Sequence, residues 1–102
     1  MCSFVFNLAA VKNGRPEDDE LEGLAQELPL HWKKLARRLK MKVSAIDSID
    51  KEKEEQSERA YKMLLNWKQA KGAEATFLVL YEALLHRYVD RRDLAEEFCC
   101  VP

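Results

Sequence analysis

The sequence is poor in the residues that build turns, with only three Gly and three Pro among 102 residues. An all-β domain needs a turn signal every ~8–12 residues, so this scarcity argues against one and predicts long helices with short connections. A chain of this length suits one compact domain, which can bury roughly two thirds of its unfolded surface without help from a metal or a disulfide.

Cysteines are also few. Cys2, Cys99 and Cys100 make an odd number, two of them are adjacent, and no C-x-x-C spacing occurs. This pattern fits neither a disulfide framework nor a zinc site and predicts a reducing compartment. Two interpretations of Cys99 and Cys100 stay open: palmitoylation or oxidation, and the preferred one, packing of this tail on the bundle.

No long apolar run is present. The longest, from Phe4 to Val11, is interrupted by Asn7, is too short to span a bilayer and lacks the basic flank of a signal peptide. We therefore predict no membrane insertion and interpret residues 1–14 as an N-terminal arm or an early turn of the first helix. The folded domain is predicted at residues 15–99, followed by a C-terminal tail at 100–102.

Signatures of catalysis and of metal or cofactor binding are missing too. His31 and His86 are the only histidines, and neither stands in a metal-ligand or catalytic-triad spacing. The sequence has no H-E-x-x-H and no glycine-rich phosphate loop. We therefore predict that the protein is not an enzyme and has no catalytic residue, metal, cofactor or small-molecule substrate.

Helical periodicity, in contrast, is abundant. The apolar spacing i, i+3, i+4, i+7, which turns one side of a helix toward a core, occurs four times between residues 21 and 84. Two shorter apolar patterns predict two further helices, so we expect an all-α domain of six helices. The residues predicted to form its core are Leu24, Leu28, Trp32, Leu35, Ala36, Leu39, Ile46, Ile49, Leu64, Trp67, Leu80, Leu84 and Leu94.

Proline and hydroxyl residues predict the helix boundaries in the first half of the chain. Pro16 fits the first turn of the first helix, ahead of a run of carboxylates that favours the positive end of the helix dipole. Pro29 ends this helix. Ser44 is predicted to cap the third helix, with Asp47 in a capping-box position. Residues 50–56 contain no apolar side chain and are predicted to be an exposed loop.

Similar signals divide the second half. Ser57 is predicted to cap a long helix that stops at Gly72, a position that favours the left-handed conformation. Thr76 is predicted to cap the fifth helix, and Asp90 to open the sixth. Tyr88, beside the turn between these two helices, is the tyrosine that we most expect to be exposed.

Charge is strongly segregated although the net charge is only −1. Cations without any acid fill residues 33–42, whereas acids dominate residues 17–22 and 47–58. A nearly neutral domain with unlike faces can bind copies or relatives of itself. Each exposed ion pair contributes only ~0.2–1 kcal/mol, so several contacts would be needed. The alternative is that these charges merely keep helix faces in water.

The residues predicted to bind another protein form three sets. The basic face, on the second helix and just after it, consists of Lys33, Lys34, Arg37, Arg38, Lys40 and Lys42. The acidic faces consist of Glu17, Asp18, Asp19, Glu22, Asp47, Asp50, Glu52, Glu54 and Glu55. The turn between the fifth and sixth helices contributes Tyr88, Asp90, Arg91 and Arg92.

Several motifs between residues 24 and 98, taken in order, resemble the death domain family. They are W-x-x-L-A-x-x-L from Trp32, I-D-x-I from Ile46, M-L-x-x-W from Met63, and the A-T pair that ends at Thr76. Within the family, L-A-R-R-L-K followed by I-D-S-I is most similar to the Fas-associated adaptor and to death-receptor tails. Many relatives have a proline between helices three and four. This chain has none there, which leaves the partner open.

The resemblance implies an antiparallel six-helix bundle of Greek-key topology. It also implies a homotypic interaction module that assembles complexes in apoptosis or in inflammatory, NF-κB-type signalling. Other death domains would be its partners, in the cytoplasm or recruited there to a membrane receptor tail. The basic second helix also permits an alternative, a nucleic-acid-binding helical domain, although the net charge and the acidic neighbours count against it. A structural module within a cytoskeletal or kinase protein is a third reading.

Overall fold

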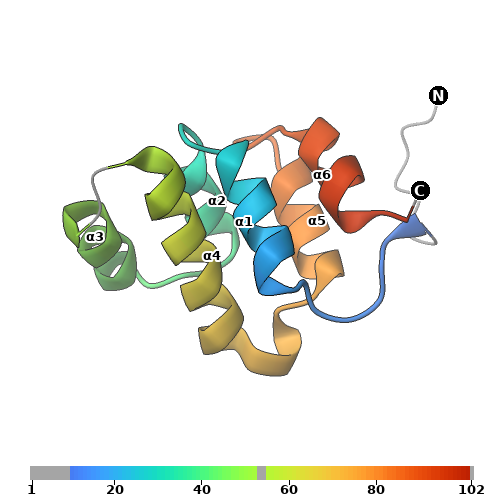
Figure 1. Cartoon of the computed structure of the whole chain (residues 1–102), viewed down its shortest axis with the longest axis horizontal. Helices are drawn as coiled ribbons and strands as arrows, with labels where there is room; N and C mark the ends of the chain where they lie inside the picture. Colours follow the sequence, from blue (N-terminus) through green and yellow to red (C-terminus); the bar gives the residue numbers. More distant parts are fainter. Residues whose placement is uncertain (1–9, 53–54, 102) are drawn as a thin grey trace.

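The computed structural model describes residues 10–52 and 55–101, and this part of the chain folds into six α-helices (Figure 1). The all-α prediction is therefore confirmed. Within the described residues the only β feature is a single antiparallel bridge, between Val11 and Cys100. The elements are α1 (Asp18–Gln26), α2 (Trp32–Arg38), α3 (Val43–Glu52), α4 (Gln56–Lys71), the 3-10 turn η2 (Gly72–Glu74), α5 (Phe77–Leu85) and α6 (Arg92–Cys99).

Helix α4 is the longest, and α1, α2 and α3 all pack on it. Helices α5 and α6 pack on each other, α6 also reaches α1, and α2 reaches α5. In Figure 1, α1 and α4 lie in front and α2 lies behind them, while α3 stands at the end of the molecule opposite α6. The surfaces of α1 and α2 therefore point to different sides of the bundle.

Every residue predicted for the core is buried, with an exposed fraction of 5% or less. Trp32 and Trp67 both lie inside rather than on the surface, at 2% and 0% exposed. The indole N–H of Trp67 has no hydrogen-bond acceptor among the described residues. Gly23 allows α6 to approach α1, because a Cβ there would stand 3.2 Å from the ring of Phe98.

The first helix begins later than predicted. Pro16 lies before it and is buried, and Glu17 occupies the N-cap position in an extended conformation. The backbone N–H of Glu17 donates to the carboxylate of Glu20, at 2.9 Å, as in a capping box. Asp18, Asp19 and Glu20 fill the first turn, where their charge complements the helix dipole.

Two predicted caps in the middle of the chain are wrong. Helix α3 starts at Val43, because the carbonyl of Lys42 accepts the N–H groups of the following turn, so Ser44 lies inside the helix. Helix α3 also continues to Glu52, which makes residues 50–52 helical rather than part of a loop. Helix α4 starts at Gln56 with Glu55 as its N-cap, so Ser57 is already in its first turn.

The boundaries around α5 are mostly as predicted. Helix α4 ends before Gly72, whose φ of 55° is unfavourable for other residues and where a Cβ would touch nothing. The hydroxyl of Thr76 accepts the N–H of Val79, at 3.3 Å, and caps α5. Asp90 does not open α6, which begins at Arg92. With a φ of 52°, Asp90 instead closes the preceding turn by donating its N–H to the carbonyl of His86.

The segments before α1 and after α6 are hydrogen-bonded to each other. Lys12 N–H donates to the carbonyl of Cys99, and Val101 N–H donates to the carbonyl of Ala10, both at 2.7 Å. The carbonyl of Gly14 accepts the N–H of Phe77 at the start of α5, at 3.0 Å. Residues 10–14 of the predicted N-terminal arm thus lie against the bundle, outside any turn of α1, and residues 1–9 lie outside the described residues.

Candidate protein-interaction surface

Helix α2 turns its apolar residues inward and its cations outward. Trp32, Leu35 and Ala36 are buried, whereas Lys34 and Arg37 are exposed. This arrangement follows from the spacing of the helix, because residues three and four apart share a side. The structure nevertheless divides the predicted basic face into three parts with different surroundings.

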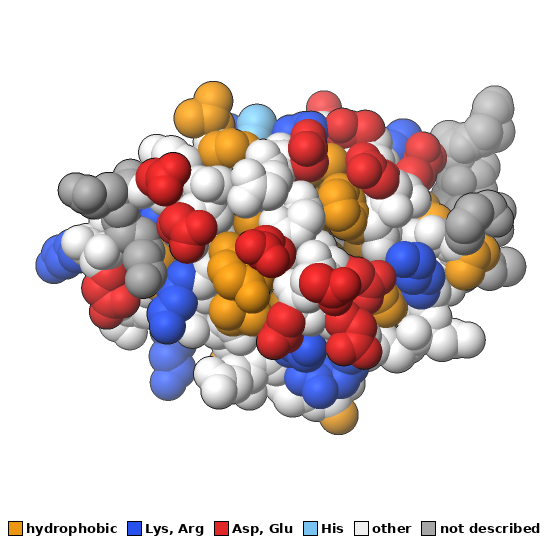
Figure 2. Space-filling model, in the orientation of Figure 1, with side chains coloured by type: hydrophobic (Ala, Val, Ile, Leu, Met, Phe, Trp, Pro, Cys, Tyr) orange, Lys and Arg blue, Asp and Glu red, His pale blue; other side chains and the backbone are white. Residues whose placement is uncertain are grey.

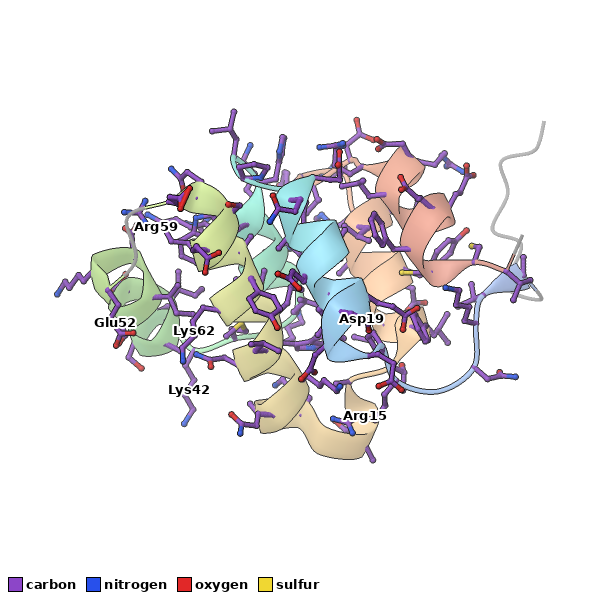
Figure 3. All side chains as sticks on the ribbon, viewed as in Figure 1. Arg15, Asp19, Lys42, Glu52, Arg59 and Lys62 are labelled. Atoms are coloured by element: carbon purple, nitrogen blue, oxygen red, sulfur yellow. The ribbon has the colours of Figure 1, made fainter. Side chains whose placement is uncertain are left out.

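The first part is the start of α2, which is held within the domain. Lys33 Nζ lies 2.7 Å from Asp50 Oδ2 of α3, and the other carboxylate oxygen of Asp50 lies 3.4 Å from Arg59 of α4. Figure 3 labels Arg59 near the start of α4. The hydrogen bond from Lys33, together with the charge of Arg59, holds the pKa of Asp50 below its usual value. Lys33, Asp50 and Arg59 therefore join α2, α3 and α4.

The second part is the end of α2, where the cations gather around Tyr88 from the turn between α5 and α6. A hollow of about 300 Å³ is lined by Lys34, Arg37, Arg38, Arg87 and Tyr88. The guanidinium carbons of Arg38 and Arg87 lie 5.6 and 5.0 Å from the centre of the Tyr88 ring. Among the described residues, none of these four cations forms an ion pair with a carboxylate. We call these five residues the cationic hollow.

His86 lies against the cationic hollow, and the nearby positive charges affect its pKa. Its Nε2 is 3.3 Å from Arg38 Nη1, and its Nδ1 accepts the backbone N–H of Tyr88 at 3.2 Å. A neutral imidazole has one acceptor nitrogen, which can serve one of these two donors, and a protonated imidazole has none. Burial lowers the pKa of His86, and the charges of Arg38, Arg87 and Lys40 lower it further. Both effects favour the neutral imidazole.

The third part lies beyond α2. Lys40 has a φ of 65°, which redirects the chain after the helix. Lys40 and Lys42 are exposed and, with Lys71 at the end of α4, line a separate groove of about 590 Å³. The six predicted cations therefore do not form one continuous surface.

The acids of α1 join those of α4 in one patch. Asp18, Asp19 and Glu22 of α1 and Glu58 of α4 all act on Tyr61, whose pKa is raised by burial and then by these four charges. Figure 2 shows carboxylates over α1, α4 and α6 on this side of the molecule. We call these four acids the α1–α4 acidic patch.

Two ion pairs partly neutralise the surroundings of this patch. Asp18 lies 2.9 Å from Lys68 of α4, and Glu20 lies 3.2 Å from Lys12. Asp19 and Glu22 are exposed and form no ion pair within the described part of the chain. Glu58 of α4 and the N-cap residue Glu17 are exposed as well and form no ion pair among the described residues, so four unpaired carboxylates are open to solvent here.

The acids predicted around the connection between α3 and α4 lie apart from α1. Asp47, Glu52 and Glu55 are exposed, whereas Asp50 is held by Lys33 and Arg59. Glu54 lies outside the described residues. Figure 3 shows Glu52 at the end of the molecule formed by α3, away from Asp19 on α1. The predicted acidic residues thus form two separate surfaces.

The residues predicted to bind a partner at the turn between α5 and α6 also differ in their surroundings. Tyr88 is exposed (55%), as predicted, and Asp90 is exposed beside it. Arg91 points back into the domain: it pairs with Asp93 at 2.9 Å and donates to the carbonyl of Glu27 at the end of α1, at 3.2 Å. Arg92 is exposed at the first position of α6.

Sequence reasoning missed Arg87. Its guanidinium donates to the Tyr88 hydroxyl at 3.2 Å and completes the cationic hollow opposite α2. The sequence did contain a sign of this contact, because Arg87 is adjacent to Tyr88 in a predicted turn next to His86.

The described cysteines are not exposed thiols. Cys99 is buried in α6, and burial raises its pKa to about 12. Cys100 is half-buried, and burial raises its pKa as well. Such thiols stay protonated and react slowly, so the packing interpretation holds for Cys99. Among the described residues, no three His, Cys, Asp or Glu side chains cluster to hold a metal ion. No helix there is both long and apolar enough to cross a membrane.

One family model matches the helical bundle. The family model of the death domain matches residues 18–98, from the first residue of α1 to the last turn of α6. No curated protein shows significant similarity to the chain. The match covers most of the chain and coincides with the six-helix bundle. The chain belongs to the death domain family, whose members are protein–protein interaction modules in signalling.

Proposed function

We propose that this domain binds other death domains through unlike charged surfaces and thereby assembles signalling complexes in apoptosis or inflammatory signalling. The observation that carries the proposal is the position of its charges. Lys34, Arg37 and Arg38 have no ion pair among the described residues, and Asp19 and Glu22 are open to solvent on another side. The similarity to the Fas-associated adaptor and to death-receptor tails would favour a cytoplasmic adaptor role.

A contact between two unlike surfaces is heterologous. Each subunit then keeps one unused surface, so subunits can add in a ring or a helix. Exposed charge pairs contribute little individually, so the assembly should need several contacts per subunit. It should also weaken as salt is added, because exposed charges are screened.

Complementary charge reversals test the proposal. One variant is Arg37→Glu with Arg38→Glu, and the other is Asp19→Lys with Glu22→Lys. Each variant alone should fail to self-associate or to bind a death domain from the same genome, in sedimentation velocity measurements. A mixture of the two should associate again, because the unmodified surface of one variant is complementary to that of the other, and the two reversed surfaces also carry opposite charges.

The control is Lys51→Glu, which reverses an exposed charge of α3 outside both surfaces. This variant should assemble as the unmodified protein does, and all variants should keep their helical circular dichroism. If both reversed variants assemble unchanged, these are not the binding surfaces. If the unmodified protein binds neither itself nor any death domain of that panel, the proposed function is wrong.

A further inference from the structure

The cationic hollow has a composition that a simple solvated helix face does not explain. Its lining holds Lys34, Arg37, Arg38 and Arg87 around Tyr88, without a carboxylate. Lys33, Lys68 and Arg91 pair with acids, whereas Lys40 and Lys42 are exposed without an ion pair among the described residues. Four positive charges around one hollow repel one another, and a bound anion would remove that repulsion.

Two of the four cations are held in place. Arg87 donates to the Tyr88 hydroxyl at 3.2 Å, and its guanidinium lies 5.0 Å from the ring centre. Arg38 lies 5.6 Å from the same ring centre and 3.3 Å from His86. Two guanidinium groups thus share one aromatic ring and need little reordering to bind a ligand. Such pre-organisation favours binding, because less conformational freedom is lost.

The chemistry of the lining selects phosphate. A guanidinium presents a planar pair of donors that matches the oxygens of a phosphate, and Lys34 adds a mobile point charge. One phosphate carries a charge of about −1.5 to −2 and three acceptor oxygens, whereas a carboxylate carries one charge. Two or more neighbouring phosphates would therefore balance the four cations. The volume of about 300 Å³ suits a compact group of this kind.

We propose that the cationic hollow is a binding site for a compact group with several phosphates, such as an inositol polyphosphate or the headgroup of a phosphoinositide. The site goes beyond the proposed function, because no other death domain contributes to it. Arg87 and Tyr88 from the turn between α5 and α6 complete it, and Lys34, Arg37 and Arg38 of α2 form its other side.

Inositol hexakisphosphate is the first probe, titrated into the whole chain at about 0.15 M salt and followed by NMR and calorimetry. Saturable binding with shifts confined to the residues of the hollow and to His86 is expected. The bound phosphates should also raise the pKa of His86, since they offset the positive charges that lower it. Absence of saturable binding, or shifts spread over all exposed cations, would overturn the proposal.

Two variants distinguish binding at the cationic hollow from non-specific attraction to exposed cations. Arg87→Gln should weaken binding roughly tenfold, because one charged hydrogen-bonding partner is lost. Lys51→Gln, which removes an exposed cation of α3, should not change it. Arg87 belongs to neither of the surfaces reversed in the assembly test, so failure here and failure of the proposed function can be told apart. Equal losses in the two variants would contradict a defined site.

Vesicles identify the source of the phosphates. Binding to vesicles with phosphatidylinositol bisphosphate, but not to those with phosphatidylserine alone at equal charge, indicates a headgroup. Binding of inositol hexakisphosphate without vesicle binding indicates a free ligand. Both results support the site. Equal binding to phosphatidylserine vesicles, or equal competition by a single-stranded oligonucleotide at the same phosphate concentration, indicates diffuse attraction and overturns it.

Discussion

The two ends of α2 carry similar cations in opposite surroundings. At the start, Lys33 is bound by Asp50, which also binds Arg59, so the charge is part of the packing between helices. At the end, Arg38 and Arg87 share the ring of Tyr88 without a carboxylate. The difference shows that a cation on the outer side of a helix can serve the fold or remain available for a ligand. The neighbouring helices decide which.

The largest effect should come from the start of α2. Trp32 is 2% exposed, and its indole N–H donates to the side chain of Gln56 at the start of α4, at 3.0 Å. Trp32→Ala should lower the free energy of unfolding by about 3–5 kcal/mol, since it leaves a cavity. Urea denaturation measures the loss. Trp32→Phe, which keeps most of the ring, should cost less, and equal costs would mean that filling the cavity does not account for the loss.

Substitution of Asp50 should have a smaller effect on the stability of the fold. Because the folded-state pKa of Asp50 lies below the unfolded value, its ion pairs stabilise the fold above about pH 3.9. This stabilisation is lost as the pH falls through the folded-state value. Asp50→Asn should be less stable than the unmodified protein at neutral pH and lose less stability on acidification. Asp47→Asn, at an exposed acid of the same helix, is the control for thermal unfolding between pH 2 and 7.

At the other end of α2, the fold should tolerate change. Tyr88 is 55% exposed, so Tyr88→Ala should alter the free energy of unfolding by less than about 1 kcal/mol. The same substitution should weaken the binding of inositol hexakisphosphate, because Arg38 and Arg87 lose the ring that orders them. A stability loss as large as that of Trp32→Ala would show that this end is also structural.

The smallest effect concerns His86. Burial comes first among the causes of its lowered pKa, followed by Arg38, so Arg38→Gln should move the pKa part of the way back toward about 6.5. An unfolded histidine binds its proton more readily, so the unmodified protein loses some stability as the pH falls below that value. Arg38→Gln should reduce this loss. NMR titration of the imidazole checks the shift, and an unchanged pKa would contradict the electrostatic contribution of Arg38.

The fold could be predicted because it depends on local patterns. The apolar stripes predicted the buried residues, and Gly72 and Thr76 marked real helix ends. The caps predicted at Ser44 and Ser57 were wrong because each helix already begins at the residue before the serine, Val43 for α3 and Gln56 for α4. Side-chain type alone does not resolve that competition.

The surfaces could be predicted only in part, since they depend on contacts between helices. The sequence indicates that the cations of α2 face outward, but the pairing of Lys33 with Asp50 requires the relative position of α2 and α3. Arg87 joins Arg37 and Arg38 only because the turn after α5 packs beside α2. No pattern in α2 itself points to that turn.

The antiparallel contact between Val11 and Cys100 has a mechanical consequence. In such a pair, the chain enters and leaves on the same side, so a force that separates the two flanks acts on one hydrogen bond at a time. The bond between Ala10 and Val101 would break first, then that between Lys12 and Cys99. These two hydrogen bonds would therefore break one after the other under low tension. The helical bundle would bear load only after both had broken.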